Sequence, residues 1–282
     1  MERPNRTERT DYGKGEARIG PRGSLPTWKL TLEYQGSRYH GWQSQDNAKT
    51  VQGILEASCR DLFKSQVEIG GAGRTDAGVH ALAQVAHLRC TRTLPSQTIL
   101  EGLNYRLPAD ICVLSVDKAE STFHARHDAE LRYYLYQLAL RRTAFAKDFV
   151  WWVKAPLDFG RISQAVALIP GRHDFACYQD RRNPGSTSTV VKVASAELDR
   201  AGDLLLFRIG ASHFLWRMVR RLVGVLVRIG QGEFPLESFV ESLQGKTFEI
   251  APWTAPSSGL FLERVTYPGE AGPGELRPTI RI

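Results

Sequence analysis

Short turns between β-type segments are the feature that most constrains how this chain can fold. Residues 189–198 and 204–209 both have the pattern of strands, and the turn Ala201-Gly202-Asp203 after the first of them is the clearest hairpin signal in the sequence. A short turn can join only antiparallel strands, because a parallel pair needs a long crossover. The pattern therefore favours largely antiparallel sheets and argues against a doubly wound parallel sheet.

Helix-type segments are interleaved with these strands. Near the start, apolar residues alternate with polar ones in the manner of a half-buried strand, at Trp28, Leu30, Leu32 and Tyr34. Thr50 is placed to cap a helix with an apolar face at Val51, Ile54, Leu55 and Leu62. Further strands are expected at 83–90, 111–116, 131–140 and 259–265, and further helices at 159–169, 214–229 and 236–243. The expected class is α/β (α+β), with a mixed, mostly antiparallel sheet flanked by helices.

The ends of the chain differ in composition from its middle. Residues 1–26 mix Arg, Glu, Gly and Pro without periodicity, which predicts a flexible basic arm, and the Pro- and Gly-rich residues 268–282 predict a flexible tail. The core between them contains no array of 20–50-residue repeats. We divide it into halves at 27–128 and 129–267. No flexible linker separates the halves, so they are expected to share one sheet or face a common cleft.

Composition excludes several classes of protein. With 42% hydrophobic residues the chain is not mainly disordered, and it contains no apolar run of about 18 residues that could span a membrane. Its polar N-terminus lacks the apolar core of a signal peptide, which predicts a cytoplasmic protein. The four cysteines are widely spaced and form no Cys-x-x-Cys pair, at Cys59, Cys90, Cys112 and Cys177. We expect reduced thiols, with no disulfide framework and no zinc site.

The charge of the chain indicates a polyanionic partner. It has 37 Lys and Arg against 30 Asp and Glu, a net charge of +7, and most of the basic residues are arginine. Arginine binds phosphate through a planar fork and stacks on bases, so nucleic acid is the leading candidate. A GC-rich genome would also enrich arginine, and the charge alone does not decide between these explanations.

The segment Gly70-Gly-Ala-Gly-Arg-Thr-Asp-Ala-Gly-Val-His-Ala81 is the richest in chemical groups. Its glycines let the backbone turn tightly and approach a ligand, and they surround Arg74 and Asp76. It is not a P-loop, since no Gly-Lys-Ser/Thr follows, and its glycine spacing is wrong for a dinucleotide fingerprint. Taken alone, it could be an ordinary turn with a surface Asp–Arg pair.

The segment 214–229 is predicted to form a largely buried helix that carries arginines. Residues at helical spacing form one stripe, namely Arg217, Arg221, Gly224 and Arg228, with Arg220 beside it. Arginines on a buried helix need partners, because an unpaired buried charge is very costly. A carboxylate in a cleft or the phosphates of a nucleic acid would supply them. The alternative is that the stripe is the solvated face of the helix.

The segments Phe123-His124-Ala125-Arg126 and Arg132-Tyr-Tyr-Leu-Tyr136 combine aromatic and basic residues. Aromatic side chains and arginine on one strand face can stack an unpaired base and clamp its phosphate. Alternatively, the tyrosines pack in the core.

Together, these segments resemble the bacterial tRNA pseudouridine synthase A family, over roughly residues 28–265. The glycine-rich loop, through its Gly-Arg-Thr-Asp-Ala-Gly-Val-His string, is the most specific match. The others, in chain order, are Gly41-Trp42-Gln43, Thr50-Val51-Gln52-Gly53, Leu103-Asn104, Leu107-Pro108-Ala109-Asp110-Ile111, Phe123-His124-Ala125-Arg126, Gly171-Arg172-His173-Asp174-Phe175, Phe214-Leu215, Met218-Val219-Arg220, Ala255-Pro256 and Gly259-Leu260.

This resemblance implies a fold, an activity and roles for particular residues. It implies the pseudouridine synthase fold, in which two similar halves share a central sheet, and a homodimer that acts on tRNA. The reaction would isomerise uridine to pseudouridine at tRNA positions 38, 39 and 40, with no cofactor and no metal. Asp76 matches the catalytic aspartate, Arg220 the arginine that pairs with it, and Tyr134 the tyrosine that stacks on the base. Arg126 and Leu260 are assigned to substrate binding.

Two positions depart from the family pattern. Tyr133 stands where many members carry a basic residue, and Arg221 stands where many carry asparagine. Both departures concern the details of substrate contact.

The residues suit this chemistry, although two other classes of function stay open. A carboxylate such as Asp76 can act at ribose C1′ or at uracil C6, and a nearby guanidinium would favour its ionised form. Arg220 is the first candidate for that guanidinium, and Arg74 is an alternative or a wedge for the flipped nucleotide. The rivals are a non-catalytic RNA-binding protein, against which the presence of Asp76 argues, and a hydrolase of an RNA glycosidic bond, which would release free uracil.

Overall fold

The strand–helix–strand–strand–helix–strand order of the first half returns in the second half, where further elements are added. The computed structural model describes residues 25–180 and 188–282. The first half comprises β1 (Thr27–Tyr34), α1 (Val51–Phe63), β2 (Val67–Gly71), β3 (His80–Cys90), α2 (Ser96–Arg106) and β4 (Ile111–Ala119). The second comprises β5 (Leu131–Ala139), β6 (Trp151–Trp152), α3 (Phe159–Ala167), β7 (Gly171–Asp174), β8 (Val190–Ala201), β9 (Leu204–Ala211), α4 (Met218–Gly230), α5 (Leu236–Leu243) and β10 (Leu260–Thr266). The elements added in the second half are β6, β7 and α5. Short 3-10 helices are η1 (Gly36–Arg38), η2 (Ala176–Tyr178) and η3 (Ala251–Trp253).

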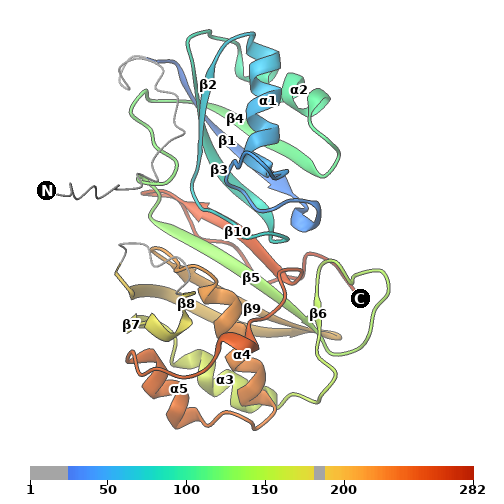
Figure 1. Ribbon diagram of the computed structural model, residues 1–282, viewed down its shortest axis with the longest axis vertical. Helices are drawn as coiled ribbons and strands as arrows, with labels where there is room; N and C mark the ends of the chain where they lie inside the picture. The colour runs from blue at the N-terminus through green and yellow to red at the C-terminus, as the bar shows by residue number, and fades with distance from the viewer. Residues whose placement is uncertain (1–24, 181–187) are drawn as a thin grey trace, which may run out of the picture.

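All ten strands of the described residues belong to one sheet, which runs through both halves (Figure 1). The strand order is β4-β1-β3-β10-β5-β9-β8-β7, with β2 beside β3 and β6 beside β5. Among the described strands only the β10–β3 and β5–β6 pairs are parallel. The sheet is thus mixed and mostly antiparallel, as predicted.

Strand β10 joins the two halves. It belongs to the second half in sequence but lies between β3 and β5 (Figure 1). Its residue Leu262 is paired with Ala81 of β3 on one side and with Tyr134 of β5 on the other. This arrangement places the glycine-rich loop, which ends where β3 begins, next to the strand that carries Tyr134.

Several local predictions are confirmed. The Thr50 hydroxyl accepts a hydrogen bond from the Gly53 amide at 3.3 Å and caps α1. Strand β1 buries alternate residues, as its sequence pattern indicates. Strands β8 and β9 form a hairpin in which Ala201 is paired with Leu204, and Gly202 takes the positive φ of +62° that this turn requires.

The sheet has a core on each face. The larger core lies on the face that carries α1 to α5, and a smaller cluster that includes Leu135, Leu206 and Phe261 lies on the other face. The tail 268–282 forms no helix or strand, but it is not free of the sheet, and here the predicted flexible tail is wrong. Its residues Leu276, Ile280 and Ile282 pack against the smaller cluster. The predicted arm, residues 1–26, lies almost wholly outside the described residues.

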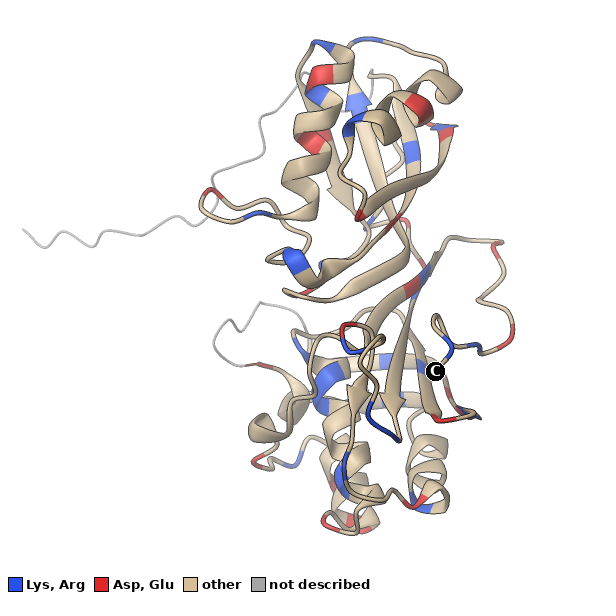
Figure 2. Ribbon diagram, turned by 90° about the vertical axis from the view of Figure 1, so that its right-hand side faces the viewer, with Lys and Arg blue, Asp and Glu red and all other residues tan. Residues whose placement is uncertain are grey.

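Lys and Arg are distributed over both halves (Figure 2). Several of the arginines are buried. Arg208 is 2% exposed and pairs with Glu263 at 2.6 Å and with Glu197 at 3.3 Å. Arg89 is equally buried and pairs with Glu68 at 2.6 Å. Part of the arginine content therefore stabilises the fold and is not available to a nucleic acid.

The described residues bear on two expectations from composition, which concern membrane spans and cysteines. No helix in that part of the chain is long and apolar enough to cross a membrane. All four cysteines are free thiols, and three of them are buried.

Candidate active site

The glycine-rich loop between β2 and β3 is fixed by hydrogen bonds to three other residues of the first half. The Tyr34 hydroxyl lies 2.8 Å from the Thr75 hydroxyl, and the Trp42 amide donates to the Thr75 carbonyl at 3.1 Å. The Gly78 amide donates to the Tyr39 carbonyl at 3.2 Å, and Gly78 has a φ of +78°, which favours glycine. Asp76 is therefore presented by a rigid turn.

The two carboxylate oxygens of Asp76 have different partners from the second half of the chain. The Trp216 indole N–H donates to Oδ1 at 3.1 Å, and Nη1 of Arg220 lies 3.6 Å from Oδ2. Burial raises the pKa of Asp76, while the charges of Arg220 and Arg217 and the hydrogen bond from Trp216 oppose that rise. The site is thus a partly buried carboxylate surrounded by cations and a donor.

Arg220 is held in place by the backbone. Its Nε donates to the Ala255 carbonyl at 2.7 Å, and the Ala255 amide donates to the Arg220 carbonyl at 3.0 Å. The Arg220 side chain is 15% exposed, and burial lowers its pKa while the charge of Asp76 raises it. The sequence resemblance had matched Arg220 to the partner of Asp76, and the structure brings the two together.

The predicted helix at 214–229 is too long at its start. Helix α4 begins at Met218, because Arg217 adopts the left-handed conformation at φ +62°. Arg217 and Arg221 both pair with buried Asp180, at 3.3 and 3.8 Å. Arg221 is only 8% exposed, so the stripe is not a solvated helix face at that position. Arg228 is paired with Glu233 at the surface.

Tyr134 lies on the helix-bearing face of β5, close to Asp76. It is 8% exposed, its ring packs edge-on against Phe214 at 5.0 Å, and the negative charge of Asp76 contributes to its raised pKa, of which burial is the main cause. The phenol is therefore a weaker acid than usual and stays protonated near neutral pH. Tyr136 points to the same face, but it is fully buried and its hydroxyl donates to the Pro256 carbonyl at 2.8 Å. Leu260 is buried and pairs with Tyr136 across β10 and β5.

Arg132 does not have the phosphate-binding role that the sequence suggested for this strand. All five of its N–H donors are directed at backbone carbonyls. The acceptors are Ala72 at 3.1 and 3.3 Å, Ala129 at 3.1 Å, Ser212 at 2.8 Å and Arg126 at 2.5 Å. Arg132 therefore links the start of the Asp76 loop, at Ala72, to residues 126–129 and to Ser212.

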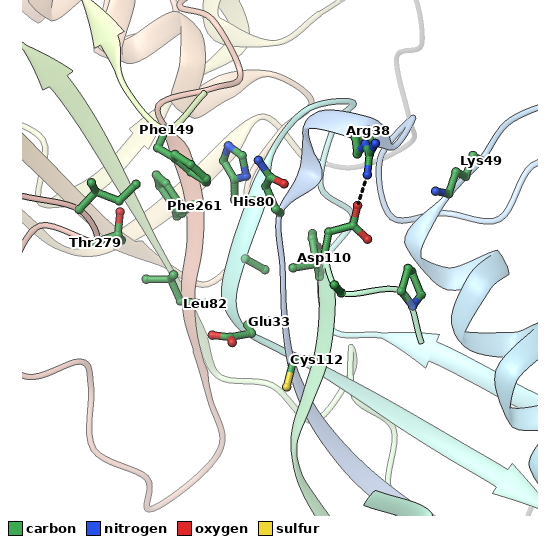
Figure 3. A pocket seen from close by; sticks show the side chains of 16 residues that line it. Glu33, Arg38, Lys49, His80, Leu82, Asp110, Cys112, Phe149, Phe261 and Thr279 are labelled. Atoms are coloured by element: carbon green, nitrogen blue, oxygen red, sulfur yellow. Dashed lines mark ion pairs between the residues drawn. The ribbon is translucent and has the colours of Figure 1, made fainter. Parts of the chain in front are cut away.

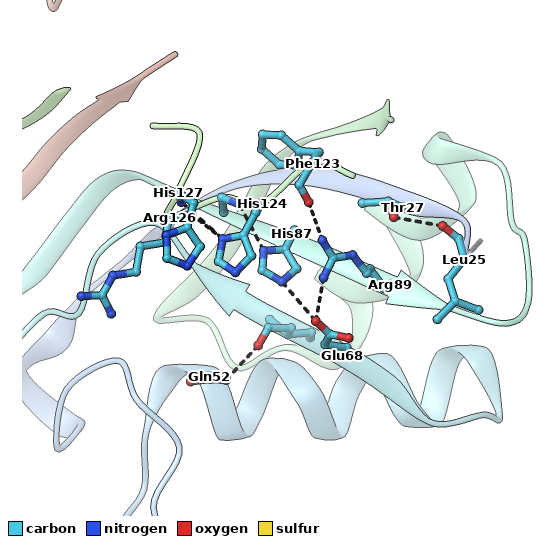
Figure 4. A network of polar contacts seen from close by, with 12 residues as sticks. Leu25, Thr27, Gln52, Glu68, His87, Arg89, Phe123, His124, Arg126 and His127 are labelled. Atoms are coloured by element: carbon cyan, nitrogen blue, oxygen red, sulfur yellow. Dashed lines mark hydrogen bonds and ion pairs between the residues drawn. The ribbon is translucent and has the colours of Figure 1, made fainter. Parts of the chain in front are cut away.

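The other predicted site residues lie on exposed turns. Arg126 lies two residues after His124, and its side chain extends away from the cluster formed by Glu68, His87 and Arg89 (Figure 4). Its backbone is linked to the Asp76 loop through Arg132. Arg74 is exposed, two residues before Asp76 on the same loop.

A pocket of about 620 Å³ lies elsewhere (Figure 3). Phe261, which lines it, is paired with Leu135 on the face opposite Tyr134 and Leu262, because neighbouring strand residues point to opposite faces. Asp76, Arg220 and Tyr134 do not line this pocket. In the described part of the chain, no three His, Cys, Asp or Glu side chains are grouped so that they could hold a metal ion.

Sequence reasoning missed Trp216. The only sequence signal was that an aromatic residue stands directly before Arg217. A helix that began at residue 214 would give no reason for the Trp216 side chain to face Asp76. The non-helical turn at Arg217 creates this contact.

Comparison with known proteins identifies the family. The family model described as tRNA pseudouridine synthase matches residues 31–128 and 165–268. Three curated relatives carry the name tRNA pseudouridine synthase A. The one from Hyphomonas neptunium is 39% identical over 86% of this chain and 99% of its own length. The one from Maricaulis maris is 37% identical over 88% and 100%, and the one from Neisseria meningitidis is 38% identical over 90% and 96%. The resemblance seen in the sequence is thereby confirmed, and the chain belongs to the tRNA pseudouridine synthase family of isomerases.

Proposed function

We propose that this protein isomerises uridine to pseudouridine at positions 38, 39 and 40 of the tRNA anticodon stem-loop, with Asp76 as the catalytic residue. The observation that carries the proposal is the pairing of Asp76, on a fixed loop of the first half, with Arg220 from the second half. The names of the relatives support tRNA as the substrate.

The reaction breaks the bond between uracil N1 and ribose C1′, turns the base, and joins C5 to C1′. C5 then loses its hydrogen as a proton, and N1 gains a proton. Nothing is oxidised or hydrolysed, so no redox cofactor or water is consumed. The ionised Asp76 attacks C1′ or C6, or stabilises positive charge at C1′. Arg220 and the indole of Trp216 favour the ionised carboxylate against the effect of burial.

The target base must leave the RNA stack before it can react, at a cost of a few kcal/mol. Tyr134 provides an aromatic face near Asp76 that can recover part of this cost by stacking. We include Arg126 and Leu260 as substrate-binding residues, and Arg74 is a candidate wedge for the vacated position. We include a cytoplasmic homodimer in the proposal, and sedimentation of the purified protein would test the dimer.

The test is incubation with unmodified tRNA transcripts, followed by site-resolved mapping of pseudouridine. We expect modification at uridines 38 to 40, and none in transcripts in which cytidine replaces them. Pseudouridine elsewhere in the tRNA would contradict the assigned positions. Release of free uracil would instead indicate a glycosidic-bond hydrolase.

A further inference from the structure

The hydrogen bond from Trp216 to Asp76 does more than favour the ionised form of the carboxylate. The indole N–H holds Oδ1, while Arg220 faces Oδ2, so the two contacts together set the plane of the carboxylate. The Trp216 side chain is 37% exposed, which leaves it at the surface of the site and not in the core.

The position of Trp216 is itself fixed by the turn before α4. Arg217 has a φ of +62°, a conformation that residues other than glycine rarely adopt. Its guanidinium lies 5.2 Å from the centre of the Trp216 ring and also pairs with Asp180 at 3.3 Å. The Asp180 amide donates to the Trp216 carbonyl at 3.1 Å. A buried carboxylate and a strained turn thus hold the indole against Asp76.

We propose that Trp216 is a positioning residue, whose indole N–H keeps the Asp76 carboxylate in the orientation in which its other oxygen pairs with Arg220. This inference rests on the proposed function of Asp76. Trp216 acts through Asp76 and takes no part in the bond changes.

Loss of the indole N–H should change the pH dependence of the reaction. The charged and titratable groups that face Asp76 are Arg220 from α4, Arg217 from the turn and Tyr134 from β5. Without the indole N–H the ionised carboxylate loses one of its stabilising contacts, so the already raised pKa of Asp76 rises further. The acid limb of the rate profile must therefore move to higher pH.

The experiment compares Trp216→Phe, which keeps a ring but removes the donor, with Trp216→His, which restores a ring N–H. Single-turnover rates with tRNA transcripts are measured across pH for both variants. Trp253→Phe is the matched control, because Trp253 is another partly exposed tryptophan with an arginine over its ring, Arg228 at 5.8 Å, and it does not contact Asp76. Urea unfolding of each variant checks that the fold is intact.

We expect Trp216→Phe to be about tenfold slower, as a hydrogen bond to a charged group is worth a factor of this order. Its acid limb should lie at higher pH than that of Trp253→Phe, and Trp216→His should recover part of the rate. A Trp216→Phe variant that matches the control in rate and profile would overturn the proposal. A slower variant with an unmoved acid limb would also overturn it, because that result indicates only a structural role.

Asp76→Asn separates this inference from the function on which it rests. Should Asp76→Asn abolish turnover while Trp216→Phe behaves like the control, the inference fails and the proposed function stands. Should Asp76→Asn retain turnover, the proposed function itself fails.

Discussion

Replacing Gly41 by alanine should displace the loop that carries Asp76. Gly41 has a φ of +91°, and a Cβ added to it would lie 2.5 Å from the Thr75 carbonyl oxygen and 3.1 Å from the Asp76 carbonyl carbon. Both are backbone atoms, so no flexible side chain can move aside. Either the Asp76 loop shifts or the Gly41 segment does, and the hydrogen bond from the Trp42 amide to the Thr75 carbonyl is strained.

The size of the effect follows from two costs and one gain. A left-handed backbone costs a residue with a Cβ about 1–2 kcal/mol, and overpacking costs about 1–3 kcal/mol. The smaller entropy of the unfolded chain returns about 0.4–1 kcal/mol. We expect Gly41→Ala to lower the free energy of unfolding by about 1–5 kcal/mol. A shift of Asp76 by about 1 Å would slow turnover by a factor on the order of 100.

Gly269→Ala is the matched control. Gly269 has a similar φ of +83°, but nothing lies within 4 Å of its added Cβ, so this variant reports the backbone cost alone. Urea unfolding and single-turnover rates on tRNA transcripts are measured for both variants. We expect Gly41→Ala to be less stable than the control by about 1–3 kcal/mol and much slower. Equal stability of the two variants, with wild-type rates for both, would refute the reasoning.

Three further predictions concern the residues around Asp76. Tyr134→Leu should lose about 10- to 100-fold in single-turnover rate, since base stacking contributes about 1–3 kcal/mol, and Tyr134→Phe should be slowed less; equal rates for the two variants would contradict a stacking role. Asp180→Ala should lower the free energy of unfolding by about 3 kcal/mol, because it leaves Arg217 and buried Arg221 without their carboxylate; a loss below about 1 kcal/mol in urea unfolding would show that water replaces it. Asp76→Asn should stabilise the fold near neutral pH, because a carboxyl whose pKa is raised by folding destabilises the native state when ionised; that gain should shrink as the pH falls toward the ordinary carboxyl value of 3.8, and a gain independent of pH would contradict it.

Much of the fold could be predicted from sequence because its signals are local. The alternation in β1, the Thr50 cap and the turn at Gly202 each depend on a few neighbouring residues and on the period of the backbone. The position of β10 between β3 and β5 depends on contacts between distant segments, and no local pattern indicates it. The same reason explains the tail. Its composition predicted flexibility, although Leu276, Ile280 and Ile282 pack against the smaller cluster.

The residues of the candidate site also differ in how far the sequence could predict them. Asp76 and Arg220 were selected because their motifs resemble a family, and the structure adds the contact between them. The role of Arg132 was misjudged, since a sequence does not reveal that five donors meet backbone carbonyls. Trp216 was missed because its contact depends on the positive φ of Arg217, a conformation that an arginine gives no reason to expect.

The most direct test of the account uses tRNA transcripts that carry tritium at C5 of their uridines. Isomerisation exchanges the C5 hydrogen with water, whereas binding alone or hydrolysis of the glycosidic bond leaves tritium on the base. We predict that the wild-type protein releases tritium without forming free uracil, and that Asp76→Asn binds the transcript equally well but releases none. Tritium release by Asp76→Asn at more than a few per cent of the wild-type rate, with deamidation excluded, would contradict the central claim that Asp76 performs the chemistry.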